Sequence, residues 1–314
     1  MSNVDTTAIT PQARATHRAS HRASGTHSLA GWIFAFPWVA IFLLFLAGPI
    51  IVALLLSFTD FGLANLQNPF NLHFIGFQNY VRLIHDATFL TSAVNTIYFV
   101  VVGVPLNIAI GLLLAIGVNQ GVSYVKAIFR VGYYVPVITS IVAVAVVWRY
   151  LYNPDSGLIN NLLHLVNLQE ADWLGNPVLA MPSIIVMAVW RNVGYAMIIL
   201  LAGLQGIDKT LYEASSIDGA TSFTRFRYVT LPMLQPTLLF VTIITTIGFL
   251  QVFAEPFVMT GGGPINRTLT VSIYLYQQGF NFFNQGYASA MGYVMFIAIV
   301  LLALIQFRLL RPQT

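Results

Sequence analysis

Long hydrophobic stretches alternate with shorter polar segments along most of this chain. An α-helix needs about 20 apolar residues to cross the roughly 30 Å of hydrocarbon in a membrane. Stretches of that length run roughly over residues 29–58, 91–118, 124–151, 178–206, 231–259 and 287–309. The pattern predicts an all-α membrane protein with six transmembrane helices.

Composition agrees with this prediction and excludes several kinds of chemistry. Of the 314 residues, 57% are hydrophobic and only 8% are charged, which is typical of a chain that crosses a membrane several times. The chain contains no Cys, so a disulfide framework, a Cys-ligated zinc or iron–sulfur centre and a thiol nucleophile are all excluded.

The basic residues indicate how the chain is oriented in the membrane. Loops with an excess of Lys and Arg face the cytoplasm, and most basic loop residues fall on one side if the N-terminus is inside, with Arg82 and Arg267 as the exceptions. The residues on that side are Arg14, Arg18, Arg22, Lys126, Arg130, Lys209, Arg225, Arg227, Arg308 and Arg311. The loops on the other side carry Asp60, Asp86, Asp155, Glu170 and Asp172. We therefore expect both termini and the segment 207–232 to be cytoplasmic.

The first 28 residues differ in composition from the rest of the chain. They are rich in Ser, Thr, Ala, Arg and His and contain no apolar run, so residues 1–28 are predicted to form a disordered basic cytoplasmic tail. Residues 29–314 then form the six-span domain. The histidines of the tail, His17, His21 and His27, are more typical of a solvated basic tail than of a metal site, and we expect no metal.

The polar segment 207–232 is predicted to contain two short helices. The first has an apolar side made by Leu211, Tyr212, Ala214, Ser215 and Ile217. Asp218 and Gly219 break this helix. In the second, Phe223, Phe226 and Val229 recur at three-residue spacing, and Pro232 is expected to end it. Such a knob, with Glu213, Arg225 and Arg227 on it, suits a protein partner or the lipid surface.

The same segment resembles the EAA loop of binding-protein-dependent ABC importer permeases. That loop has the pattern E-A-A, three residues, G and, further on, L-P. This chain gives Glu213-Ala214-Ser215, then Gly219, then Leu231-Pro232, with Ser215 in place of the second Ala. The resemblance implies contact with a cytoplasmic ATPase through Glu213, Ala214, Ser215, Asp218, Gly219, Ala220, Phe223, Leu231 and Pro232. We call residues 207–232 the EAA-like segment.

Further segments resemble the sugar-importing branch of these permeases, the maltose-type carbohydrate uptake family. They are Pro49 with Leu56-Ser57-Phe58, then Phe74-Ile-Gly-Phe-Gln-Asn-Tyr80, Asn153-Pro-Asp-Ser-Gly-Leu-Ile-Asn160 and Thr260-Gly-Gly-Gly-Pro264. Each match is weak by itself, but their order around an EAA-like segment is specific. The resemblance implies the type I ABC importer permease fold in the bacterial cytoplasmic (inner) membrane.

The resemblance also implies a set of partners. These are a second homologous permease that forms a heterodimer with this chain, two copies of a cytoplasmic ABC ATPase, an extracytoplasmic solute-binding protein, a sugar or sugar-like solute and membrane lipids, but no nucleic acid. ATP and Mg²⁺ would bind the ATPase, so this subunit is expected to have no cofactor and to be no enzyme. Residues Gly203–Thr210 approach the phosphate-binding pattern G-x-x-x-x-G-K-T, but Asp208 replaces its second Gly and would repel phosphate.

The family places its sugar between the two permeases, against the fourth and fifth spans. The matching positions in this chain are Arg191, Asn192, Tyr195, Thr245 and Phe249, with Glu255 nearby. Aromatic faces stack on sugar CH groups, and amide and hydroxyl groups bind sugar hydroxyls. Ordinary helix packing explains Tyr195 and Phe249 equally well.

Arg191 leaves two alternatives open for the solute. A cation inside a membrane suggests an anionic solute such as a glycerophosphodiester, or else a structural role in which the guanidinium is paired or snorkels. A stand-alone ion-coupled carrier is a further alternative. Such carriers usually place an acid at the middle of the membrane, and this sequence has none there.

Overall fold

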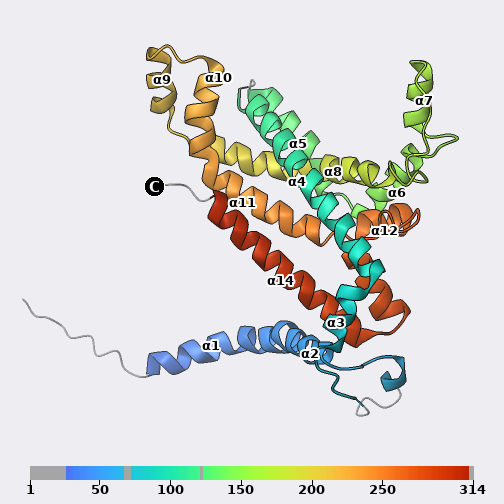
Figure 1. Cartoon of the computed structure of the whole chain (residues 1–314). Coiled ribbons are helices and arrows are strands. Elements are labelled where there is room, and N and C mark those ends of the chain that lie inside the picture. The colour runs from blue at the N-terminus through green and yellow to red at the C-terminus, as the bar shows by residue number, and fades with distance from the viewer. Residues whose placement is uncertain (1–25, 67–71, 121–122, 311–314) are drawn as a thin grey trace, which may run out of the picture. The chain divides into compact units, whose positions relative to one another are not determined.

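Helices make up almost all of the described chain (Figure 1). The computed structural model describes residues 26–66, 72–120 and 123–310, so most of the predicted tail, residues 1–25, lies outside it. The elements are α1 (Thr26–Phe42), the π-turn η1 (Leu43–Ala47), α2 (Gly48–Ser57), the 3-10 turn η2 (Leu63–Leu66), α3 (Gln78–His85), α4 (Ala87–Gln120), α5 (Ser123–Ile138), α6 (Ile141–Leu151), α7 (Leu158–Leu165), α8 (Ala180–Gln205), α9 (Lys209–Ile217), α10 (Ser222–Arg225), the π-turn η3 (Phe226–Thr230), α11 (Leu231–Leu250), α12 (Ala254–Thr260), α13 (Val271–Tyr276), the π-turn η4 (Gln277–Asn281) and α14 (Gln285–Leu310).

Five of the predicted spans are continuous helices in the structure. They cover Gly31–Ser57, Ala87–Gln120, Ala180–Gln205, Ser222–Leu250 and Gln285–Leu309, and each is long and apolar enough to cross a membrane. The all-α prediction is therefore confirmed for the described residues, where the β-structure is one isolated bridge between Thr59 and Phe74.

The third predicted span, residues 124–151, is not one straight helix. Its two halves, α5 and α6, meet at an angle of 97°. The break falls at Ser140, whose ψ of 122° is extended and not helical. An apolar run indicates that a segment is buried in lipid or protein, but it does not indicate whether the segment is straight or bent. The pattern alone could therefore not separate the two helices.

The prediction for the fifth span, residues 231–259, is wrong at both ends. Pro232 does not stop the preceding helix, because α10, η3 and α11 form one helix over Ser222–Leu250. The wider π-turn η3 ends at Thr230, two residues before Pro232, and gives room for the proline ring in the preceding turn. At the other end the helix stops at Leu250, and Glu255 belongs to the separate helix α12.

The chain divides into two compact units, residues 1–51 and 52–314. In the first unit, α1, η1 and the start of α2 form an apolar helix with large exposed side chains such as Trp32, Phe34 and Phe45. Exposed apolar side chains all round a helix are expected for a segment in lipid.

In the second unit, α4 packs mainly along α8 and also against α11. Small residues allow the closest approaches, as is usual between membrane helices. A Cβ on Gly103 of α4 would lie 2.7 Å from the ring of Phe249, and one on Gly194 of α8 would lie 1.9 Å from the carbonyl oxygen of Tyr133 in α5. These two glycines therefore fix how closely α11 and α5 approach the central pair.

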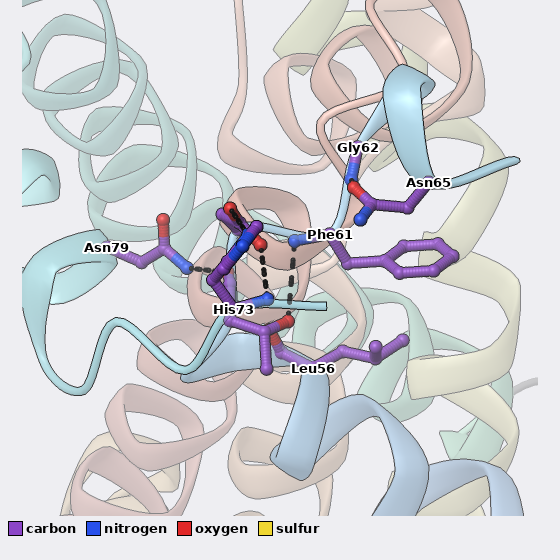
Figure 2. A network of polar contacts seen from close by, with 8 residues as sticks. Leu56, Phe61, Gly62, Asn65, His73 and Asn79 are labelled. Atoms are coloured by element: carbon purple, nitrogen blue, oxygen red, sulfur yellow. Dashed lines mark hydrogen bonds and ion pairs between the residues drawn. The ribbon is translucent and has the colours of Figure 1, made fainter. Parts of the chain in front are cut away.

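The segment that follows α2 is fastened to α3 by a polar network (Figure 2). The Asn79 amide donates to the carbonyls of Ser57 and Thr59, each at 2.9 Å, and the backbone N–H of His73 donates to Asp60 at 3.0 Å. The backbone N–H and the ring of His73 hold the pKa of Asp60 below its usual value. The network ties residues 57–60 to His73 and to Asn79 at the start of α3.

A second polar cluster joins α4 to α13 and α14. The Asp86 carboxylate accepts hydrogen bonds from the backbone N–H groups of Thr88 and Phe89 at the start of α4, and from the Tyr274 and Tyr287 hydroxyls, both at 2.7 Å. Burial raises the pKa of Asp86, but these four hydrogen bonds outweigh burial and leave that pKa below its ordinary value. Burial and the neighbouring Asp86 carboxylate raise the pKa of Tyr274 to about 12.

We predict that Asp86→Asn lowers the stability of the purified protein at pH 7 by about 2 kcal/mol, because hydrogen bonds to a charged acceptor are lost. The lowered folded-state pKa means that this stability is present above the unfolded pKa of about 3.9 and is lost as the pH falls through the folded pKa. Thermal unfolding in detergent from pH 7 to pH 3 should therefore show the gap between wild type and variant closing in acid. The exposed Asp60→Asn is the control, and an equal effect from both variants would contradict the prediction.

Candidate functional site

The EAA-like segment begins with a capped helix. The Asp208 carboxylate accepts a hydrogen bond from the Thr210 backbone N–H at 2.9 Å and so caps the N-terminus of α9. The same hydrogen bond lowers the pKa of Asp208. Asp208 thus has a structural role in the pattern that resembles a phosphate-binding loop.

The break after α9 is a Schellman motif centred on Gly219. The Ala220 N–H donates to the Ser215 carbonyl at 2.9 Å, and the Gly219 N–H donates to the Ser216 carbonyl at 3.1 Å. Gly219 has a φ of +74°, in the left-handed region that favours glycine. The glycine of the motif is therefore required by the backbone of the elbow.

Two side-chain contacts hold the two helices of the elbow together, and a third caps the second helix. Arg225 donates to the Ser216 hydroxyl at 3.1 Å, and the Tyr212 and Thr230 hydroxyls are 3.1 Å apart. Thr221 caps α10 by accepting from the Thr224 N–H. Sequence analysis did not identify these contacts. The spacing of Ser, Thr and Tyr around the Gly was their only signal in the sequence.

The outer surface of this elbow is apolar and exposed. Ile217 is 87% exposed, Phe223 76% and Tyr228 74%. Glu213 is exposed as well, and no ion pair to it is present in the described part of the chain. Of the predicted coupling residues, Glu213, Ala214, Asp218, Gly219 and Phe223 lie together on the exposed elbow, Ser215 and Ala220 are half-buried at its hinge, and Leu231 and Pro232 lie further along the helix.

A second candidate site is a cleft of about 360 Å³ beside the bend of the third span. Four of the six predicted pathway residues line it, namely Arg191, Asn192, Phe249 and Glu255. The sequence analysis missed the remaining lining residues, which are Ile141, Gly248, Gln251, Val252, Phe253 and Ala254. They come from the start of α6, the end of α11, the link that follows it and the first residue of α12. The predicted third and fifth spans were wrong in these two places.

Arg191 points its guanidinium at the bend. Its Nη2 donates to the Val137 carbonyl at 3.3 Å and lies 3.5 Å from the Thr139 carbonyl. The carbonyls in the last turn of a helix have no partner within that helix, and a cation is favourable there. Arg191 therefore supplies hydrogen bonds that the bend between α5 and α6 requires.

The other predicted pathway residues divide by burial. Phe249 is buried against Phe99, with ring centroids 5.2 Å apart, so it forms a wall of the cleft and not a free stacking surface. Tyr195 and Thr245 lie one helical turn away from Arg191 and Phe249 and do not line the cleft. Asn192 donates to the Ala188 carbonyl at 2.8 Å and keeps its amide oxygen towards Arg191.

Known proteins share the sequence pattern and the fold of this chain. The model of the family described as "Binding-protein-dependent transport system inner membrane component" matches residues 107–314. The lactose transport system permease protein LacF of Rhizobium radiobacter is 38% identical, over 91% of this chain and 96% of its own. The arabinooligosaccharides transport system permease protein AraP of Bacillus subtilis is 33% identical, over 89% and 88%. A chain of a bacterial ABC transporter involved in the import of the acidic polysaccharide alginate matches the fold with a TM-score of 0.79, at 24% identity over 92% of this chain and 97% of that one.

The fold and its relatives define a multi-pass membrane permease, a transport subunit and not an enzyme. More particularly, the chain belongs to the family of binding-protein-dependent transport system inner membrane components. The resemblance found in the sequence is thereby confirmed, together with the type I importer fold.

We predict that Gly219→Val destabilises the elbow by about 1–2 kcal/mol, because a β-branched residue is strained at a positive φ. A Cβ at this position meets no atom within 4 Å, so the effect comes from the backbone alone. Hydrogen–deuterium exchange of the amides of residues 214–220 should be faster in this variant. Gly219→Asn is the matched control, since Asn tolerates the left-handed region, and equal exchange in both variants would refute the explanation.

Proposed function

We propose that this chain is a permease subunit of an ATP-driven importer for a sugar or sugar-like solute in the bacterial inner membrane. It forms half of the pore with a second homologous permease, receives solute from an extracytoplasmic binding protein and contacts one of two ATPase subunits that bind ATP and Mg²⁺. Family membership supports the class, and the names of the relatives LacF and AraP support the solute.

The observation on which this proposal rests is one helix that reaches both candidate sites. The helix Ser222–Leu250 carries Phe223 of the elbow at one end and Gly248 and Phe249 of the cleft at the other. About 40 Å separates these ends at 1.5 Å of rise per residue. A displacement of the elbow therefore reaches the cleft through one continuous helix.

The elbow is suited to pass on such a displacement. The Schellman motif, the Arg225–Ser216 hydrogen bond and the Tyr212–Thr230 contact fix α9 to that helix, while Ile217 and Phe223 stay exposed for a partner. A protein surface is a better occupant than lipid, because Glu213, Asp218 and Arg227 interrupt the apolar residues on the same elbow. ATP-driven movement of the ATPase would thus move the elbow and α11 together.

The contacts of Arg191 favour a sugar over the alternative of an anionic solute. Its guanidinium already serves the carbonyls of Val137 and Thr139, as the structural interpretation of Arg191 requires. Amide groups of Asn192 and Gln251 line the same cleft and suit sugar hydroxyls.

The proposed orientation predicts which loops an impermeant thiol reagent can reach in intact cells. Because the chain has no Cys, Asn161→Cys and Lys209→Cys each introduce a single thiol at an exposed position. We expect Asn161→Cys to react and Lys209→Cys to react only after the cells are opened. Labelling of Lys209→Cys in intact cells would place the elbow outside and would contradict both the orientation and the ATPase contact.

The proposed ATPase contact predicts the effect of a charge on the elbow. Ile217→Asp should weaken binding of the ATPase by about 2 kcal/mol, roughly 30-fold, because an exposed apolar contact is replaced by a carboxylate. The measurement is the amount of ATPase that copurifies with the permease and the rate of solute-stimulated ATP hydrolysis. Ile265→Asp is the matched control, since Ile265 is 84% exposed and lies in a different loop. Normal ATPase retention in Ile217→Asp would show that the elbow is not the contact.

A further inference from the structure

The cleft contains one cation and one acid among the described residues that line it. Arg191 lies on α8 and Glu255 lies on α12, and both line the cleft. The remaining lining residues are amides, apolar side chains and Gly. Within this subunit, these two side chains therefore set the charge of the cleft.

Both side chains are held in place by the protein. Arg191 is tied to the carbonyls of the bend, and α8 itself is held against α5 by the close approach of Gly194 to Tyr133. Glu255 is only 7% exposed and stands in the first turn of α12, where the helix dipole favours a carboxylate. The helix α12 packs on α6, which follows the bend, and on α8, which carries Arg191.

The two groups act on each other through space. Burial disfavours the charged form of Glu255, and the positive charge of Arg191 opposes this effect. The two side chains form no contact within 4 Å, and His73–Asp60 is the one ion pair at that distance in the described residues. Both side chains line the cleft without contacting each other. In a partly desolvated cleft, removing either charge would leave the other uncompensated.

We propose that Glu255 is a specificity-determining residue, which offsets the charge of Arg191 across the cleft so that the cleft accepts uncharged polar solutes and rejects anions. A sugar hydroxyl both donates and accepts hydrogen bonds, so it can meet the carboxylate and the guanidinium alike. An anionic solute would gain from Arg191 but would be repelled by Glu255. The inference rests on the proposed function, in that it places the solute in this cleft.

The charge balance can be measured without any solute. Gln251 is exposed and lines the cleft, so Gln251→Cys places a single thiol of this subunit there. The thiol is modified in the assembled transporter with a negatively charged and, separately, with a positively charged methanethiosulfonate reagent. The rate with the negative reagent divided by the rate with the positive reagent reports the local electrostatic potential. The same ratio at Val178→Cys, which is 77% exposed and outside the cleft, is the reference.

With both charges present, the ratio at Gln251→Cys should be close to the reference. Adding Glu255→Gln should raise it about tenfold in favour of the negative reagent, and adding Arg191→Gln should lower it by a similar factor. The ratio should stay close to the starting value when Glu255→Gln and Arg191→Gln are combined, and also in the conservative variant Glu255→Asp. A ratio that Glu255→Gln leaves unchanged, in a complex that assembles normally, would overturn the proposal.

The solute class is tested in the same complexes by protection of the thiol. We expect lactose, but not the anionic lactobionate, to slow modification of Gln251→Cys, and lactobionate to become protective once Glu255→Gln is added. Equal protection by both solutes in the complex that retains Glu255 would overturn the proposed selectivity. Protection by neither solute in any complex would contradict the proposed sugar function, while the rate ratios would still decide the charge balance.

Discussion

The bend between α5 and α6 and the cleft beside it depend on the hydrogen bonds from Arg191 to the carbonyls of Val137 and Thr139. A helix can bend by 97° in an apolar setting only if the carbonyls that it frees find new donors. The guanidinium supplies them from α8. Without the bend, α5 and α6 would form a straight span, Ile141 would not reach the cleft, and α12 would lose the helix against which it packs.

The need of backbone carbonyls for hydrogen-bond donors also explains the elbow and the helix that follows it. At Gly219 the Schellman motif satisfies the last carbonyls of α9, and at residues 226–230 a π-turn accommodates Pro232 without ending the helix. One helix therefore runs from the exposed apolar surface of the elbow to the cleft. In the proposed function, this continuous helix would connect the ATPase contact to the solute site. The helix packs against α4 and α8.

The two candidate sites could be predicted from the sequence to different degrees. The positions of the elbow residues followed from local rules, because a left-handed turn needs Gly219 and the flanking helices need short apolar patterns. The cleft is assembled from α6, α8, α11 and the start of α12, and only Arg191, Asn192, Phe249 and Glu255 were expected there. Phe249 illustrates the limit: an aromatic residue at that position suits a sugar, yet Gly103 and Phe99 leave its ring buried.

By itself the sequence determined the class of the protein, five of its spans, the elbow and the family, because hydrophobic length, glycine at a positive φ and a short motif are local properties. Only the tertiary structure decided where the third span bends, where the fifth begins and ends, and what Arg191 does. Those features depend on which carbonyls lack partners and which side chain from another helix can reach them. Such contacts join residues more than 50 positions apart, as Arg191 and Val137 are, and no periodicity along the chain records them.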